Sequence, residues 1–185
     1  MRAIRLICLA GVIAFVATSL ALCSAQEPMP DELQVRAAIV VNLVRFITFK
    51  SNRDEMHGPL HICLLGYDQQ SSALENYLSA HSVDGRPFQV RRVSSSERFD
   101  ECQVLYMSST ERHHFDGLYA SLIEAGVLTI SDDPAFATSG GIIGLPVIGD
   151  RIEIQINLAC AEQSGIAISS RLLGVAKVIR KVAGK

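Results

Sequence analysis

The sequence predicts an α/β fold: one layered domain whose mainly parallel sheet is flanked by helices and is followed by a late β-hairpin and a C-terminal helix. Two observations predict this class. Short apolar runs alternate with segments of helical periodicity between residues 60 and 132, which is typical of parallel strands joined by crossover helices. Two further apolar runs around a Gly-Asp turn then precede a last stretch of helical spacing.

Residues 1–25 are expected to be a cleaved signal peptide. Two arginines precede an apolar run over residues 6–22, and small residues end at Ala25, which is the pattern that signal peptidase recognises. The apolar run is short for a membrane span. A lipid anchor on Cys23 stays open as an alternative, although a leucine stands where lipoprotein processing prefers a small residue. The mature chain would be residues 26–185, which suits one domain with a sizeable core.

The composition of the mature chain argues against nucleic acid as a partner. Loss of the two leader arginines leaves 15 of the 17 basic residues beside 19 acidic ones, a formal charge of −4. The sequence contains no basic block and no basic segment interleaved with aromatic residues, which are the usual marks of nucleic-acid binding.

The first helix of the mature chain is expected to begin at Asp31, which forms a capping box with Gln34. Apolar residues cover most of its circumference, so the helix should be largely buried. Asn42 and Arg45 share the remaining face, for which an exposed strip, a buried polar pair and a docking face stay open. The apolar positions at helical spacing are Leu33, Ala37, Val40, Val41, Val44 and Ile47.

The central part of the chain is expected to supply four strands and two helices. A doubly wound sheet would place the strands in the order 2-1-3-4, although residues 94–101 are short for a parallel crossover. The expected strands are residues 60–66, 88–93, 102–109 and 126–132, and the expected helices are residues 69–80 and 110–124.

The last part of the chain is expected to form a hairpin, a short helix and a closing helix. Residues 140–157 hold two apolar runs separated by a Gly-Asp pair, which is typical of a hairpin turn. Asn157 is expected to cap a helix over residues 158–163, and Ser169 or Ser170 to cap the closing helix. The apolar residues that this closing helix should direct inward are Leu172, Leu173, Val175, Ala176, Ile179 and Val182.

No catalytic arrangement is recognised, so the chain is not expected to be an enzyme or to need a cofactor. The spacings of zinc, thioredoxin-type, phosphate-loop and serine-hydrolase motifs are all missing from the sequence. His113 and His114 are adjacent, so on a helix they should point to different sides and could not easily hold one metal ion. Cys160 lies between two alanines and is interpreted as a small buried hydrophobe.

Two segments resemble the YfiR family of small periplasmic proteins. The late segment IEIQINLACAEQSGIAISSRLLGVAKVI, residues 152–179, is the more specific, and RAAIVVNLVRFITF, residues 36–49, is the second. The early segment departs from the family pattern at Val41 and at its end, where a Trp-Pro pair would be expected, and Gln155 stands where an acid is frequent. The matching residues are Asn42, Arg45, Phe46, Asn157, Leu158, Gly165, Ile168, Ser169, Ser170, Leu172 and Leu173.

The resemblance implies a non-catalytic periplasmic regulator. Better-known members bind the periplasmic sensor domain of an inner-membrane diguanylate cyclase and hold it inactive, which lowers cyclic-di-GMP and biofilm formation. An outer-membrane lipoprotein can sequester such a repressor, and a homodimer is left open. The alternative is a periplasmic small-molecule-binding accessory module of a transporter or receptor. The docking surface is expected around the late hairpin and final helix, residues 140–180, where the matching residues are densest, and the face of Asn42 and Arg45 is the second place. The candidate binding residues are Asn42, Arg45, Phe46, Gly140, Gly141, Gln155, Asn157, Ser169, Ser170 and Arg171.

The resemblance also implies a disulfide between Cys63 and Cys102. The expected strand order agrees with this pairing, because it makes the strands of the two cysteines neighbours at ~5 Å. Exported cysteines tend to pair, but only Cys160 then remains in the mature chain. The family's second, later disulfide therefore has no counterpart, and Cys160 is expected to be a buried thiol without a catalytic role.

Protein purified from the periplasm is expected to begin at Gln26, because cleavage after Ala25 follows from the order of charged, apolar and small residues. Intact-mass spectrometry combined with N-terminal sequencing measures this directly. A mature chain that begins at Cys23 and carries acyl chains would contradict the expectation and establish the lipid anchor.

Overall fold

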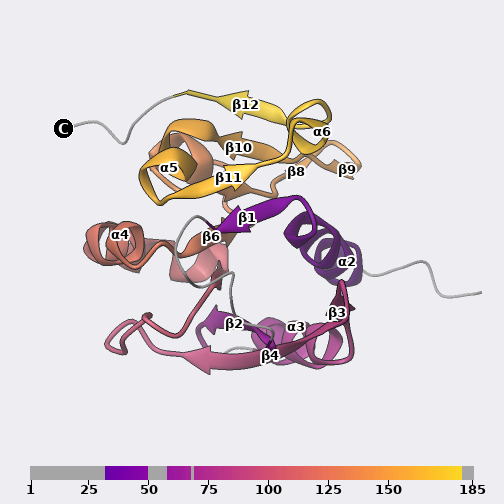
Figure 1. The fold of residues 1–185 in the computed structure, drawn as a ribbon, viewed down its shortest axis with the longest axis vertical. Helices are drawn as coiled ribbons and strands as arrows, with labels where there is room; N and C mark the ends of the chain where they lie inside the picture. The colour runs from indigo at the N-terminus through magenta and orange to yellow at the C-terminus, as the bar shows by residue number, and fades with distance from the viewer. Residues whose placement is uncertain (1–31, 50–57, 68, 181–185) are drawn as a thin grey trace, which may run out of the picture.

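The computed structural model describes residues 32–49, 58–67 and 69–180, and it confirms the predicted α/β class. Its main sheet has eight strands in the order β12-β10-β7-β6-β5-β2-β4-β3, and most neighbouring strands are parallel (Figure 1). Across these ranges, no helix has the length and apolar character needed to cross a membrane. The expected signal peptide and the capping residue Asp31 lie outside the described residues.

The four central strands are parallel and follow the predicted order 2-1-3-4. In space they run β4-β2-β5-β6. The short connection between β4 and β5 passes from one neighbour of β2 to the other, so it does complete a parallel crossover. The bounds of these strands are β2 Leu60–Leu65, β4 Arg86–Val93, β5 Val104–Met107 and β6 Leu128–Ser131.

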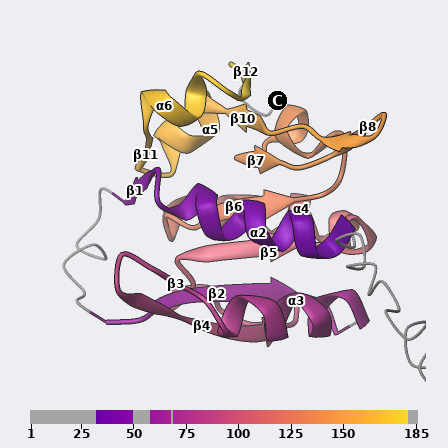
Figure 2. The ribbon, with the colours of Figure 1, turned by 90° about the vertical axis from the view of Figure 1, so that its right-hand side faces the viewer.

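Helices cover both faces of the sheet, and the sheet separates two apolar cores. Helices α2 (Glu32–Val44) and α3 (Gln69–Ser79) lie in front of the sheet in Figure 2. Ile62 and Leu64 of β2 belong to the core beneath these helices, whereas the alternate residues Cys63 and Leu65 belong to the second core. This second core also contains Phe115 and Leu122 of α4 (Phe115–Glu124), so β2 is the wall that both cores share.

The predicted helix over residues 110–124 begins as a 3₁₀ segment, and the first helix ends sooner than its periodicity suggested. Residues Ser109–His114 form η3, which leads directly into α4. Ile47 was expected to continue the first helix, but it opens strand β1 (Ile47–Phe49). Strand β1 pairs antiparallel with β11 (Ile166–Ile168). Its backbone hydrogen bonds are therefore made with a segment that is distant in the sequence.

The late hairpin is confirmed. Strands β8 (Val147–Ile148) and β9 (Arg151–Ile152) pair antiparallel around Gly149-Asp150, and Gly149 has a φ of +66° that favours glycine. The hairpin projects from two strands of the main sheet, β7 (Ile143–Gly144) and β10 (Gln155–Asn157), which pair antiparallel with each other. The remaining short elements are β3 Ser82–Val83, η4 Phe136–Ser139 and α5 Leu158–Gln163.

The long closing helix was a wrong prediction. Only Ser170–Leu173 are helical, as α6, and the chain then enters strand β12 (Lys177–Ile179), which pairs parallel with β10. Two features explain the difference. Gly174 weakens a helix at that point. The backbone of β10 offers an open edge for pairing, and directly before it Ile154 O accepts a hydrogen bond from Lys177 N–H at 2.8 Å. Val175, expected to face inward, is 75% exposed.

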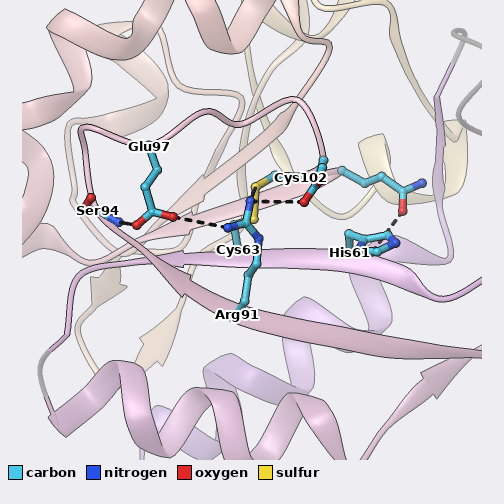
Figure 3. Close-up of a disulfide and its surroundings, with 8 residues drawn as sticks. His61, Cys63, Arg91, Ser94, Glu97 and Cys102 are labelled. Carbon is cyan, nitrogen blue, oxygen red and sulfur yellow. Dashed lines mark hydrogen bonds and ion pairs between the residues drawn. A yellow bond between two sulfur atoms is a disulfide. The ribbon is translucent and has the colours of Figure 1, made fainter.

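A disulfide joins Cys63 and Cys102, as the resemblance implied, with their Cα atoms 5.7 Å apart. Next to it, His61 and Gln103 bind each other twice: Gln103 N–H donates to His61 O at 3.0 Å, and His61 N–H donates to Gln103 Oε1 at 3.0 Å (Figure 3). The start of β5 is therefore held on β2 by one covalent and two hydrogen bonds.

Replacing both Cys63 and Cys102 with alanine should lower the free energy of unfolding by about 4 kcal/mol, because the bridge spans 39 residues of chain and restricts the unfolded state accordingly. Urea unfolding under oxidising conditions measures this loss. Cys160→Ala is the matched control, since it deletes a fully buried sulfur without removing a cross-link. A double variant that loses no more than twice the control's loss would show that the cross-link adds nothing.

Candidate functional site

The early and late segments of the chain meet at one place on the surface. Strand β1 pairs with β11, and Ser169 N–H donates to Phe46 O at 2.9 Å. Beside this pairing lies an open hollow of ≈ 400 Å³, here named the junction hollow. It is lined by Arg45, Phe46, Thr48, Ala167, Ile168, Ser169 and Arg171. Four of the candidate binding residues, namely Arg45, Phe46, Ser169 and Arg171, are therefore brought together.

Two other candidates lie on exposed helix positions and are not among the residues that line the junction hollow. Asn42 is exposed on α2, and its amide donates to Ala38 O one turn earlier at 2.8 Å. Ser170 is exposed at the first position of α6, while Ser169 caps that helix by accepting from Arg171 N–H. Of the three alternatives for Asn42 and Arg45, the structure shows the exposed strip, because both residues face solvent.

The remaining four candidates lie inside the protein, where they organise the chain around β10. Asn157 is fully buried; its carbonyl oxygen caps α5 by accepting from Cys160 N–H, and its amide donates to Ala137 O at 2.7 Å. Gln155 is also buried and donates to Glu153 at 2.8 Å. These contacts tie β10 to η4 and to the hairpin, which is an architectural arrangement rather than a contact surface.

Gly140 and Gly141 are needed for close packing around Phe136. Gly140 has a φ of +106°, in the left-handed region that favours glycine. A Cβ atom on Gly141 would lie 2.2 Å from the ring of Phe136, which is fully buried. A side chain at Gly140 would therefore strain the backbone, and one at Gly141 would require the core to move.

Exposed apolar side chains gather around the β8–β9 hairpin. Six large apolar side chains are exposed among the described residues, and four of them, Val35, Val147, Ile148 and Val175, line hollows beside this hairpin. Two hollows flank the hairpin, one of ≈ 670 Å³ toward α2 and one of ≈ 420 Å³ toward the loop before β12, and both include Arg151 and Ile152. The two hollows together are named the hairpin surface, and its apolar residues are Val35, Ile39, Val147, Ile148, Ile152, Ile154 and Val175.

Charged groups border the hairpin surface. Glu32, Asp150 and Arg151 line the hollow toward α2. On the other side, the Gln155 amide that donates to Glu153 lowers the pKa of that carboxyl, and Lys177, 3.5 Å away, lowers it further. An apolar centre with a charged border is the anatomy of a protein–protein interface.

The carboxyl ends of the parallel strands, where open α/β sheets bind ligands, are occupied partly by internal polar contacts. Asp132 follows β6, and its carboxylate accepts Ser109 N–H at 2.6 Å. The same carboxylate lies 3.6 Å from the guanidinium of Arg36, which also pairs with Glu32. Arg36 is buried on α2, so α2 crosses part of this edge and supplies the counter-charge itself.

The expectation that His113 and His114 diverge was wrong. Their ring centroids are 3.9 Å apart, and both rings lie beside the carboxylate of Glu111. In a 3₁₀ segment the side chains three residues apart are eclipsed, which places Glu111 and His114 on the same side of η3. Residues three apart share a face of an α-helix as well, so the cluster was missed because only the adjacent histidines, and not Glu111, were considered.

The surroundings of the disulfide are polar on the solvent side. Arg91 lies between Cys102 and Glu97, with Nη2 3.8 Å from the Cys102 sulfur and Nη1 3.4 Å from the Glu97 carboxylate (Figure 3). The backbone N–H of Ser94 donates to Glu97 and is the main cause that lowers the pKa of that carboxyl. This network ties the crossover loop to β4 through Arg91.

Cys160 is a fully buried thiol outside the disulfide, as expected. Its sulfur lies 3.9 Å from the Tyr119 hydroxyl, which in turn donates to Gln163. Burial, with the neighbouring thiol, raises the pKa of Tyr119, so this phenol is a poor general base for the sulfur. The late hairpin lies within the docking area expected from the sequence, residues 140–180, but the contribution of Val35 and Ile39 from α2 to this surface was not foreseen.

The fold and these surfaces define a doubly wound α/β domain with an apolar hairpin surface and a buried disulfide. The chain belongs to the YfiR/HmsC-like family (DUF4154), whose model matches residues 33–177. Members of this regulatory family are not typically enzymes. No curated protein matches the chain.

Two solved structures share the fold at low sequence identity. One is the ABC domain in complex with L-Trp from Streptococcus pneumonia, with 16% identity and a TM-score of 0.54, covering 75% of this chain and 59% of that one. The other is a conserved domain protein from Vibrio cholerae O1 biovar El Tor, with 13% identity and a TM-score of 0.59, covering 80% and 60%. This chain thus spans about three fifths of each structure.

Asn157→Ala should lower the free energy of unfolding by about 2–3 kcal/mol, because it removes the cap of α5 and leaves the Ala137 carbonyl without its donor. Asn157→Asp retains the cap acceptor but not the donor, so its loss should be smaller. Chemical unfolding of both variants measures the difference. Unchanged stability together with lost partner binding would instead make Asn157 a contact residue.

Proposed function

We propose that the mature chain is a periplasmic repressor that binds the periplasmic sensor domain of an inner-membrane diguanylate cyclase and holds it inactive, thereby lowering cyclic-di-GMP and biofilm formation. Two facts support this proposal: the chain belongs to the YfiR/HmsC-like family, and its exposed apolar side chains are concentrated on one surface. An exported protein cannot reach cytoplasmic nucleotide, so its effect must pass through the periplasmic part of a membrane protein.

The docking site for the cyclase is assigned to the hairpin surface in this proposal. Ile148 is 51% exposed and Val175 is 75% exposed, and both line one hollow together with Ile152. Isolated exposed apolar residues are ordinary, but a continuous patch marks an interaction site. A standard interface buries ~800 Å² on each partner, which the hairpin surface would reach by extending over α2 and β12.

The junction hollow is the second docking area in this proposal. Arg45 and Arg171 are exposed at its border, and the part of the chain that the structure describes gives neither of them a carboxylate partner. Two arginines suit an acidic segment of a partner, because a guanidinium binds carboxylates with two parallel hydrogen bonds. Sequestration by an outer-membrane lipoprotein, or pairing of two copies of the chain, would compete for these surfaces.

A periplasmic small-molecule-binding role is the second candidate, and one observation favours it. The fold is shared with an ABC domain that was solved in complex with L-Trp. Against it, Arg36, Asp132 and Ser109 bind one another at the carboxyl ends of the strands. Small-molecule pockets need polar groups that converge on a ligand, and these three groups converge on each other.

Ile148→Asp and Val175→Asp should each weaken binding to the cyclase sensor domain by about 30-fold or more, as expected for central apolar residues of an interface. Cells that carry these variants in place of the wild type should have raised cyclic-di-GMP. Tyr67→Asp is the matched control, since Tyr67 is also exposed and lies outside the hairpin surface. Circular dichroism confirms that each variant is folded.

A different result would decide between the two candidates. Unchanged cyclic-di-GMP in a deletion strain, with no cyclase recovered by crosslinking in the periplasm, would overturn the repressor proposal. Binding of a small aromatic amino acid by the wild type, measured by calorimetry, would then support the small-molecule role.

A further inference from the structure

We propose that Glu111, His113 and His114 bind a divalent transition-metal ion of the Zn²⁺ class. Each residue offers one ligand atom, and the three atoms all lie within 4.8 Å of one another. His114 Nε2 and Glu111 Oε2 are 3.5 Å apart. Ligands of a tetrahedral Zn²⁺ ion lie about 3.3 Å apart, given metal–ligand bonds of about 2.0–2.1 Å, so small side-chain rotations suffice to close the site.

The chemistry of the three ligands selects the kind of ion. Two imidazoles and one carboxylate suit Zn²⁺ and its neighbours Cu²⁺ and Ni²⁺, whereas Mg²⁺ and Ca²⁺ prefer oxygen ligands alone. His113 is exposed, while Glu111 and His114 are half-buried. An ion would therefore approach from solvent and keep an open coordination position on the side of His113.

The local backbone orients these ligands in advance. Ser108 is buried and caps η3, which fixes where the 3₁₀ segment begins. His113 Nδ1 lies 3.2 Å from Thr110 O. When Nδ1–H donates to this carbonyl, Nε2 carries the lone pair that a metal needs, and such a bond on the other ring nitrogen is the usual support of a metal-binding histidine.

The cluster lies at the place in the fold where α/β sheets bind ligands. Gly66 ends β2, and η3 follows β5, so the cluster lies outside the carboxyl ends of two neighbouring strands whose connections run in opposite directions. Gly66 has a φ of +104°, and a Cβ atom there would lie 3.1 Å from the Glu111 carboxylate. The missing side chain lets Glu111 pack against the end of β2.

The nearest cation in the sequence is directed away from this cluster. Arg112 lies within the segment, but its guanidinium pairs with Asp116 at 3.4 Å and stacks over the ring of Phe115 at 5.2 Å. Metal binding would tie η3 to the end of β2 through Glu111. Because only the folded chain holds the three ligands together, the ion would also raise the melting temperature.

The test uses untagged protein purified from the periplasm, stripped with a chelator and titrated with Zn²⁺ by calorimetry. One equivalent should bind, and the melting temperature should rise with Zn²⁺ concentration. His113→Ala, His114→Ala and Glu111→Gln should each weaken the Zn²⁺ affinity by more than about tenfold. Even replacing residues that only hydrogen-bond to a metal ligand lowers metal affinity by about 10–100-fold. His81→Ala is the control, because His81 stacks on Tyr77 in another part of the fold.

The outcomes separate clearly. Loss of the Zn²⁺ response in the three ligand variants, with retention of the response in His81→Ala, supports the site. If the other two variants fail to fold, His113→Ala is sufficient for the test, because His113 is exposed and its replacement should not affect folding. Absence of binding at 100-fold molar excess of Zn²⁺, or binding that the ligand variants leave unchanged, would overturn it. Neither outcome depends on whether the chain represses a cyclase.

Discussion

The position of β2 between two parallel neighbours is the constraint on which the rest of the structure depends. Its backbone is paired on both edges, with β4 and β5, and its alternate side chains enter two different cores. A strand that is buried on both faces is expected to be largely apolar, and residues Leu60–Leu65 are apolar except for the half-buried His61. The disulfide on Cys63 then connects this strand covalently to the segment that begins β5.

The second half of the chain builds outward from that centre and ends by returning to the N-terminal helix. Strands β7, β10 and β12 extend the sheet, and the hairpin between β7 and β10 leaves it to lie beside α2. The pairing of β1 with β11 then joins this half of the chain to the segment that follows α2. Both exposed areas, the hairpin surface and the junction hollow, therefore depend on contacts between segments more than 100 residues apart in the sequence.

The sequence could predict the elements whose pattern is local. Four buried strands, their order and the hairpin turn follow from apolar runs and one Gly-Asp pair, and Asn157 and Ser169 are recognisable as helix caps. The closing strand could not be predicted in this way, because residues 172–179 have apolar positions compatible with a helix. Only the open edge of β10, which is formed by distant residues, makes β12 a strand.

The candidate sites divide along the same line. Residues Arg45, Phe46, Ser169 and Arg171 share the junction hollow, and the two matching segments that contain them were visible in the sequence. The late hairpin was also expected as a docking area, but the contribution of Val35 and the exposure of Val175 could not be predicted, because exposure depends on which neighbours pack beside a side chain. The cluster at Glu111 was missed for a different reason: Glu111 and His114 share a face in either kind of helix, but the close approach of the adjacent His113 and His114 rings depends on their side-chain rotamers, which a sequence pattern does not give.

The place of β12 at the end of the sheet has a consequence for solubility at high concentration. A last strand presents backbone N–H and C=O groups that another chain could extend, which is a common route to aggregation. Here the strand is short, its first residue is a lysine paired with Glu153, and Arg180 follows it. Such charge discourages a second copy from adding strand to strand. Removing it would expose the protein to ordered self-association while leaving its fold intact.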